Sequence, residues 1–384
     1  MMTSNDPPAK PHANCRTALL LGGGGARAAY QVGVLKAVAE IVPEASPNPF
    51  PIICGTSAGS INTVALASNA GEFHLGVARI IEVWSNFRLA KVFYVDTKHL
   101  LKRSFGWFWS HFFGKWYAGP SSLLDNQPLR ELLGKYISFE RIENSFKSGD
   151  LHAYCLTACS YTTGESTTFF DGNPDIIDWQ RVHRLGRRSK MSIDHLMASS
   201  AIPVVFPSVK IDSEFFGDGS MRQISPISPA IHLGAEKILI IGLRAEALLG
   251  TREPAEFSPS LGEISGYVLD TLFLNSLYAD VARMERVNRL LSDNQTADER
   301  LKVIEHLIIS PSRDIADIAI KHFKKLPKNF RVALTLLGLN RGNSRRFISY
   351  LMFTEDFCRD LIELGYQDAM AQQQQLRKFL QCES

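Results

Sequence analysis

Short apolar runs alternate along the chain with longer stretches whose apolar residues recur at helical spacing. Runs of strand length lie at residues 17–21, 50–54, 152–158, 166–170, 209–211, 237–241 and 303–309. Helix-like stretches lie between them, as at residues 31–38 and 61–67. This alternation predicts a layered α/β/α fold with a mainly parallel central sheet, in which loops at the carboxyl ends of the strands hold the reactive groups.

The composition indicates a soluble globular enzyme. The 384 residues are 45% hydrophobic and 21% charged, enough to bury a large core, and the net charge of +3 is too small to indicate a nucleic-acid partner. The six cysteines form no C-x-x-C pair, which favours reduced thiols and no metal. Residues 1–15 are polar with no apolar leader segment, so we expect a disordered tail and a cytoplasmic protein.

The sequence Gly-Thr-Ser-Ala-Gly at residues 55–59 lies between a predicted strand and a predicted helix. A G-x-S-x-G motif in that context forms a sharp turn that raises the serine hydroxyl above the backbone, which makes Ser57 a candidate nucleophile. Gly55 and Gly59 would let a substrate approach this turn closely. The alternative is a helix start at which Ser57 caps the first turn, and the spacing alone does not separate the two.

A second glycine-rich turn, Gly-Gly-Gly-Gly-Ala-Arg at residues 22–27, joins the first predicted strand to the first helix. The backbone amides of Gly23, Gly24 and Gly25 could converge there on an anion at the positive end of the helix, with Arg27 adding a fixed charge. A dinucleotide fingerprint would need glycine at position 27 or 28, and a Walker A loop would need Gly-Lys-Ser/Thr, so the sequence excludes both. An oxyanion hole and a glycine turn without chemistry are the remaining interpretations.

Asp218 is the candidate base. It follows an apolar pair and stands between two glycines, which leaves room for a second catalytic loop beside it. The alternative interpretation is an Asp-Gly hairpin turn. A Ser-acid-His triad would need a later histidine, and the chain offers His232 in a helical stretch, His306 in a predicted strand, and His322. We interpret these histidines as structural or surface residues.

Taken in order, these elements resemble the patatin-like phospholipase family of acyl hydrolases over roughly residues 17–243. The similar blocks are the oxyanion loop (22–27), the serine elbow (55–59), the segment before the Asp strand (198–203) and the catalytic Asp element (218–220). The chain departs from the family at Ala28 and Ser220, where glycine is commoner.

The resemblance implies a patatin-like phospholipase A, lysophospholipase or esterase that forms an acyl-enzyme on Ser57 with Asp218 as base. The residues it implies besides this dyad are Gly23, Gly24, Gly25 and Arg27 in the oxyanion hole and Gly55, Gly59 and Gly219 in the supporting turns. It implies no cofactor, and the expected partner is a lipid ester. Acyl transfer on the same dyad and a catalytically silent lipid-binding adaptor are the alternatives.

Residues 93–117 hold ten aromatic side chains with four lysine or arginine residues among them. In a helix, Phe105, Trp109, Phe112 and Trp116 would share one face, and Trp107 would lie opposite. Such a segment suits a membrane interface or a lid over a lipid site, and packing into the core is the equal alternative. The segment is too short and too charged to span a bilayer.

The expected organisation therefore has three parts. They are a disordered tail at 1–15, a patatin-like catalytic domain at 16–310 with its lid or membrane segment at 91–118, and a helical C-terminal region at 311–384. A cytoplasmic enzyme of this kind could also bind peripherally at the inner membrane face. The sequence does not indicate an oligomeric state.

Overall fold

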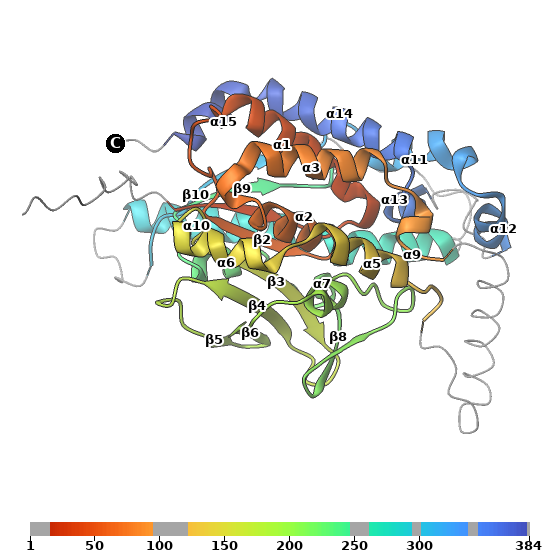
Figure 1. The fold of residues 1–384 in the computed structure, drawn as a ribbon, viewed down its shortest axis with the longest axis horizontal. Coiled ribbons are helices and arrows are strands. Elements are labelled where there is room, and N and C mark those ends of the chain that lie inside the picture. The colour runs from red at the N-terminus through yellow and green to blue at the C-terminus, as the bar shows by residue number, and fades with distance from the viewer. Residues whose placement is uncertain (1–15, 95–121, 246–260, 294–300, 337–344, 382–384) are drawn as a thin grey trace, which may run out of the picture.

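A computed structural model describes residues 16–94, 122–245, 261–293, 301–336 and 345–381 (Figure 1). Ten strands in these ranges form one mixed sheet in the order β10-β9-β1-β2-β3-β4-β6-β5, with β8 paired to β3 and β7 paired to β8. The strands are β1 (Thr17–Leu21), β2 (Ile52–Thr56), β3 (Ala153–Ser160), β4 (Ser166–Gly172), β5 (Trp179–Arg181), β6 (Arg184–Arg188), β7 (Val209–Ile211), β8 (Glu214–Asp218), β9 (Lys237–Ile241) and β10 (Glu305–Ile309).

The described helices flank this sheet, and none of them is long and apolar enough to cross a membrane. They are α1 (Ala29–Ile41), α2 (Ala58–Ala67), α3 (Phe73–Ser85), α5 (Gln127–Tyr136), α6 (Phe139–Ser148), α7 (Ile193–Ser199), α8 (Ser228–His232), α9 (Leu261–Asp270), α10 (Ser276–Asp293), α11 (Ile315–His322), α12 (Lys328–Leu336), α13 (Arg345–Leu351), α14 (Glu355–Ala371) and α15 (Gln373–Leu380). A π-helical turn at Thr271–Asn275 joins α9 to α10.

The centre of the sheet is parallel. Strands β10, β9, β1, β2 and β3 run in one direction, so their carboxyl ends meet at one edge. Strand β3 pairs antiparallel with β4 and, through its last residues, with β8. The turns that follow β1 and β2 therefore lie at the same edge, where active-site loops collect in α/β sheets.

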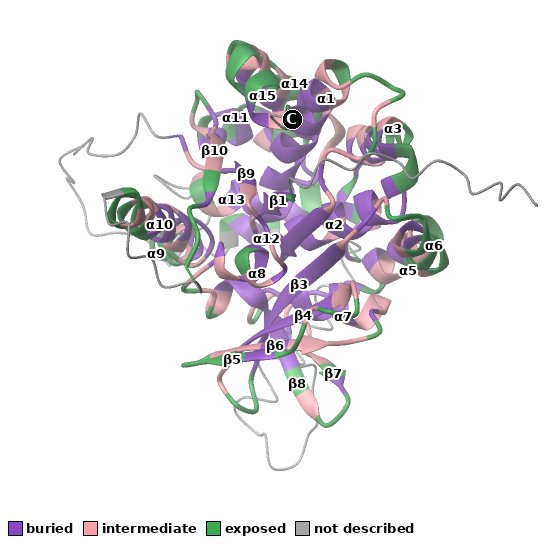
Figure 2. Ribbon diagram, turned by 90° about the vertical axis from the view of Figure 1, so that its left-hand side faces the viewer, coloured by how far each residue is buried: buried purple, intermediate pink, exposed green. Residues whose placement is uncertain are grey.

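Helices cover both faces of the parallel strands because these strands are apolar on both sides. Leu19, Leu21 and Ile53 belong to one hydrophobic core, whereas Leu20 and Ile52 belong to a second core on the opposite face. The first core includes side chains of α1, α2, α3 and α14, and the second includes those of α8 and α10 (Figure 1, Figure 2). The fold is the expected layered α/β arrangement with a mainly parallel sheet.

The C-terminal helices share the core of the sheet. Helix α14 runs beside α1 (Figure 1), and Tyr30 Oη donates a hydrogen bond to Asp368 Oδ2 at 3.0 Å. Phe357 and Leu361 of α14 are fully buried in the core that also contains Leu19. The domain boundary expected at residue 310 stays a prediction.

Each strand expected from the sequence is present, with ends that shift by up to two residues. Strand β8 corresponds to the Asp strand that the family resemblance implies, whereas β5 and β6 are not predicted from the sequence. The described cysteines are buried and free of disulfides: Cys54, Cys155, Cys159 and Cys358. Two sets of predictions fall outside the described residues, and they concern the tail at 1–15 and the aromatic residues Phe105, Trp107, Trp109, Phe112 and Trp116.

Candidate active site

Ser57 lies between the last residue of β2 and the first residue of α2. Its backbone has φ 54° and ψ −128°, a left-handed conformation that is strained in a residue with a side chain. No amide of the helix donates to its hydroxyl, so the interpretation of Ser57 as a helix cap is wrong. A strained strand-to-helix turn of this kind holds a serine hydroxyl clear of the backbone.

Gly59 brings the elbow against the glycine-rich loop. A methyl group on its Cα would collide with the carbonyl oxygens of Leu21 and Gly22, so only glycine lets the first turn of α2 lie against the end of β1. Gly55 and Gly219 also stand where an added methyl group would collide with neighbouring atoms. The elbow and the glycine-rich loop therefore share one edge of the sheet.

Strand pairing places Asp218 beside the elbow. Thr56 pairs with Thr157 on β3, and the next residue, Ala158, pairs with Asp218 at the end of β8. Strand β4 occupies the other edge of β3, so β2 and β8 lie on the same edge, and Ser57 and Asp218 meet where these two strands end. Both residues are buried, with exposed fractions of 2% and 1%.

The Asp218 carboxyl group is buried, and only one of its two oxygens accepts a hydrogen bond from the described residues. Its Oδ1 accepts a hydrogen bond from the Ser220 amide at 2.9 Å, while Oδ2 is buried and has no hydrogen-bond partner among the described residues. Burial raises the pKa of Asp218 from 3.8 to about 6, and the nearby Ser57 hydroxyl and Ser220 oppose part of this rise. A carboxylate with that pKa and a free oxygen near a serine is suited to act as a general base at neutral pH.

Two serines at the end of α7 hold the elbow in place. Ser199 Oγ accepts a hydrogen bond from the Ser57 amide at 3.0 Å and donates one to Thr157 O at 2.7 Å. Ser200 Oγ donates to Ser57 O at 3.3 Å. The amide of Asp218 donates to the carbonyl of the next residue, Ala201, at 2.9 Å. The sequence predicts no role for this segment, which in the structure connects Ser57 to Asp218.

The glycine-rich loop contains free donors. Within the described ranges, the amides of Gly23 and Gly24 form no hydrogen bond. Gln31 Nε2 donates to Gly22 O at 2.8 Å, and a methyl group on Gly23 would collide with the Ser220 hydroxyl, so the loop lies against the turn that follows Asp218. Unpaired amides just before a helix are donors for an anion.

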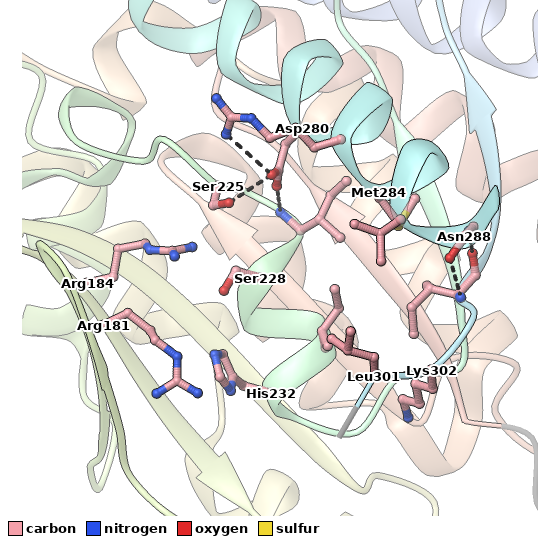
Figure 3. A pocket seen from close by; sticks show the side chains of 15 residues that line it. Arg181, Arg184, Ser225, Ser228, His232, Asp280, Met284, Asn288, Leu301 and Lys302 are labelled. Atoms are coloured by element: carbon pink, nitrogen blue, oxygen red, sulfur yellow. Dashed lines mark hydrogen bonds and ion pairs between the residues drawn. The ribbon is translucent and has the colours of Figure 1, made fainter. Parts of the chain in front are cut away.

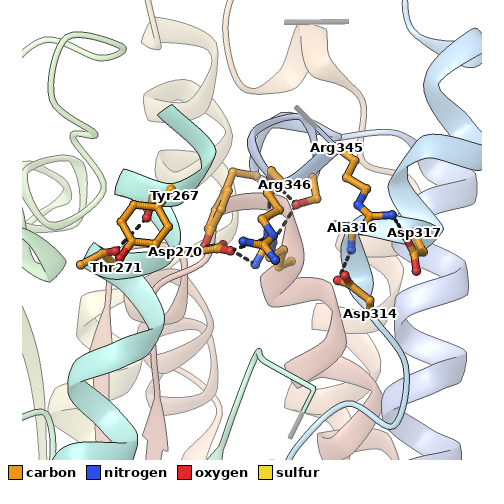
Figure 4. A network of polar contacts seen from close by, with 11 residues as sticks. Tyr267, Asp270, Thr271, Asp314, Ala316, Asp317, Arg345 and Arg346 are labelled. Atoms are coloured by element: carbon orange, nitrogen blue, oxygen red, sulfur yellow. Dashed lines mark hydrogen bonds and ion pairs between the residues drawn. The ribbon is translucent and has the colours of Figure 1, made fainter. Parts of the chain in front are cut away.

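Arg27 contacts distant helices rather than presenting a free charge. Its Nη1 lies 3.1 Å from Asp270 Oδ1, its Nε donates to Ser349 Oγ at 2.7 Å, and its guanidinium lies 3.9 Å from the centre of the Tyr350 ring. Arg346 approaches Asp270 as well, with 3.6 Å between Nε and Oδ2 (Figure 4). We call Asp270, Arg346, Ser349 and Tyr350 the C-terminal clamp. A direct role of Arg27 in an oxyanion hole stays a prediction.

Gly25 is held by the same clamp. Its φ of 54° is left-handed, and a methyl group on its Cα would collide with the Tyr350 carbonyl. The sequence near the glycine-rich loop does not predict its contacts with the clamp, because Arg27 and its partner Ser349 are separated by 322 positions.

An apolar path adjoins the nucleophile. A cavity of about 30 Å³ is lined by Ser57 and apolar side chains from α2, α3 and α5. A second cavity of about 60 Å³ shares four of those residues, Ile61, Trp84, Phe87 and Leu129. Its lining also includes Tyr136 and the polar residues Asn62, Asn69 and Arg79. We call the two cavities together the apolar path.

The histidines that follow Asp218 have other neighbours. The His232 ring stacks on a tryptophan with 4.6 Å between ring centroids. His306 and His322 lie 3.3 Å from a glutamate and 2.7 Å from an aspartate, respectively. In the described part of the chain, no group of three acidic, histidine or cysteine residues could hold a metal ion. The arrangement favours a serine-acid pair over a triad.

Comparison with known proteins identifies similar sequences. A family model described as patatin-like phospholipase matches residues 19–231. A curated protein of Pseudomonas aeruginosa, named a cGAMP-activated phospholipase, is 27% identical over 215 residues, which are 54% of this chain and 53% of that protein. The chain thus aligns with about half the length of this relative.

Two solved structures align with most of this chain at low similarity. VipD from Legionella pneumophila aligns with 94% of this chain and 67% of its own, at 11% identity and a TM-score of 0.38. Human GIVD cytosolic phospholipase A2 aligns with 95% of this chain and 60% of its own, at 11% identity and a TM-score of 0.46.

Proposed function

The chain belongs to the patatin-like phospholipase family, and on this premise we propose that it is a serine hydrolase of lipid carboxylic esters with Ser57 as nucleophile and Asp218 as base. The observation that carries the proposal is the pairing of a strained serine elbow with a buried carboxylate whose second oxygen has no partner among the described residues. Neither feature stabilises the fold, because backbone strain and an unsatisfied buried oxygen both cost free energy.

In the first half of the reaction, Asp218 Oδ2 takes the proton of the Ser57 hydroxyl as Oγ attacks the ester carbonyl carbon. The tetrahedral intermediate carries its negative charge on the former carbonyl oxygen, and the amides of Gly23 and Gly24, with that of Gly25, stabilise it. Each such donor contributes a factor of about 100 to 1000 in rate. The intermediate collapses to an acyl-enzyme, and the alcohol leaves with the proton from Asp218.

In the second half, water attacks the acyl carbon and gives a proton to Asp218. The second tetrahedral intermediate releases a fatty acid, and Ser57 recovers its proton from Asp218. The same dyad would transfer the acyl group if an alcohol replaced this water, so acyl transfer differs from hydrolysis only in the acceptor.

The apolar path supports a lipid as the substrate. It adjoins Ser57 and is lined mainly by aliphatic and aromatic side chains of α2, α3 and α5. An acyl chain bound there would remove apolar surface from water, and each buried methylene contributes about 0.8 kcal/mol. The ester carbonyl at the mouth of such a path would lie beside the nucleophile.

The decisive experiment is labelling with a fluorophosphonate, which phosphonylates activated serines. We expect wild type to be labelled, Ser57→Ala to be unlabelled and Asp218→Asn to be labelled slowly, with Ser292→Ala on exposed α10 as the matched control. Fatty acid release from phospholipid, lysophospholipid and p-nitrophenyl ester substrates then measures turnover.

Other outcomes would identify the alternatives. Labelling of Ser57→Ala at the wild-type rate would refute the nucleophile. A folded wild type with no labelling would indicate the lipid-binding adaptor. Acyl esters of added glycerol that form at the expense of free fatty acid would indicate the transferase.

A further inference from the structure

An open basin lies apart from the proposed active site. It has a volume of about 630 Å³ and is bounded by β5 and β6, α8, α10 and the segment before β10 (Figure 3). Lys302 in its wall donates to Gly234 O at 3.3 Å, and these residues precede β10 and β9. The basin is thus at the amino ends of β9 and β10, whereas the glycine-rich loop and the elbow follow the carboxyl ends of the parallel strands β1 and β2.

Positive charge dominates the lining of this basin. Four cations line it, Arg181, Arg184, Arg283 and Lys302, against one carboxylate, that of Asp280. The Asp280 carboxylate already accepts hydrogen bonds from Ser225 Oγ at 2.8 Å and from the Ile227 amide at 3.0 Å. The basin therefore carries a net positive charge that its own acid leaves unbalanced.

Two of these cations are directly opposed. Arg181 on β5 and Arg184 on β6 are partners across the antiparallel strand pair. In the part of the chain that the structure describes, neither forms an ion pair. Like charges directly opposite each other destabilise a strand pair, and an anion bound between them would remove that repulsion. Paired guanidinium groups are well suited to the oxygens of a phosphate.

The remaining lining is largely apolar. Met284 of α10 faces the arginines across the basin, and Leu301 lies below it (Figure 3). Val287 also lines the basin, and the exposed fractions of Val287 and Leu301 are 40% and 52%. His232 lies beside Arg181 (Figure 3), and burial together with the two arginines lowers its pKa to about 4. The imidazole is therefore neutral at pH 7 and offers a flat, uncharged surface. The volume lies in the usual range for a small-molecule site.

We propose that this basin binds a soluble phosphate-bearing ligand with an apolar or aromatic body, the chemistry of a nucleotide, and that Arg181 and Arg184 hold the phosphate. The body of the ligand lies against α10, between Met284 and Leu301. The proposed site can be tested whether or not the protein hydrolyses esters, because ligand binding is measured without turnover.

The test is isothermal titration calorimetry of the full chain with AMP and with inorganic phosphate, at low and high salt. We expect wild type to bind both, AMP more tightly, and added salt to weaken both. The Arg181→Gln/Arg184→Gln double variant should bind AMP at least about tenfold more weakly, because charge-assisted hydrogen bonds are lost. Arg289→Gln removes the same charge from an exposed α10 position outside the basin and should bind like wild type.

The thermal melting curve of the double variant verifies that it folds. The Arg181→Lys/Arg184→Lys variant keeps both positive charges but loses the planar guanidinium groups, so it should bind AMP more weakly than wild type and more tightly than the double glutamine variant. Failure of wild type to bind AMP and phosphate, or equal binding by the double variant, would overturn the proposal. Binding only to vesicles that contain phosphatidic acid, and not to vesicles of phosphatidylcholine or to AMP, would also overturn it and place a lipid headgroup in the basin.

Discussion

Replacement of Asp218 by asparagine should abolish activity and stabilise the protein at the same time. Asparagine has the size of aspartate and stays neutral at every pH, so it retains the acceptor for the Ser220 amide and removes only the buried charge. The rise in the Asp218 pKa from 3.8 to about 6 corresponds to a cost of about 3 kcal/mol for ionising this group in the fold.

The effect of Asp218→Asn on stability depends on pH. Because the folded state binds the Asp218 proton more tightly than the unfolded chain does, the free energy of unfolding of wild type falls as the pH rises from about 4 to about 6. Below that window the carboxyl group is protonated in both states. We therefore expect Asp218→Asn to raise the free energy of unfolding by up to about 3 kcal/mol at about pH 8, and by little at about pH 4.

Urea denaturation of wild type and variant at both pH values measures this difference. Asp175→Asn, at an exposed position, is the control and should change neither value by more than about 0.5 kcal/mol. The kcat/KM of wild type should fall about tenfold per pH unit below pH 6, as the base is protonated. Equal stability of wild type and Asp218→Asn at pH 8, or an activity profile that bends near pH 4, would show that Asp218 is not a desolvated base.

Three further substitutions test the surroundings of the dyad. Gly25→Ala should cost about 1–3 kcal/mol of stability and slow fluorophosphonate labelling, because the left-handed backbone at Gly25 and the Tyr350 carbonyl leave no room for a methyl group. Gly22→Ala, where the added methyl group points into open space, should do neither. Equal labelling of the two variants would contradict the role of the clamp. Ser199→Ala should lower kcat about tenfold to hundredfold with little change in KM, as the Ser57 amide loses its acceptor, and an unchanged kcat would remove Ser199 from the machinery. Leu129→Ala widens the apolar path and should shift the preference among p-nitrophenyl esters toward longer acyl chains. The substitution should also lower the free energy of unfolding by about 2–5 kcal/mol. An unchanged preference would mean that the acyl chain lies elsewhere.

The sequence predicts those strands whose pattern of apolar and polar residues matches their burial in the folded sheet. Strand β9 reads as a continuous apolar run because both of its faces are buried between helices. Strands β5 and β6 contain several charged residues, and their sequence gives no such signal. In the folded sheet, Arg187 and Arg188 of β6 lie 5.1 Å from the ring centres of Phe169 and Phe170 on β4, and these stabilising contacts do not exist before the sheet forms.

The same division holds for the candidate site. The strained turn at Ser57 could be predicted because the glycines and the serine that form it are close together in sequence. The contribution of Ser199 could not, since its hydrogen bond to the Ser57 amide spans 142 positions. The environment of Asp218 also depends on distant strands, and burial by those strands rather than any neighbour in sequence raises its pKa.

The C-terminal clamp can be completed only late in the synthesis of the chain. The ribosome adds 322 positions between Arg27 and its partner Ser349. A nascent chain that already contains Ser57 and Asp218 therefore still lacks the contacts that Arg346, Ser349 and Tyr350 make around Gly25 and Arg27. We expect products of premature termination before Arg346 to lack the proposed ester hydrolase activity.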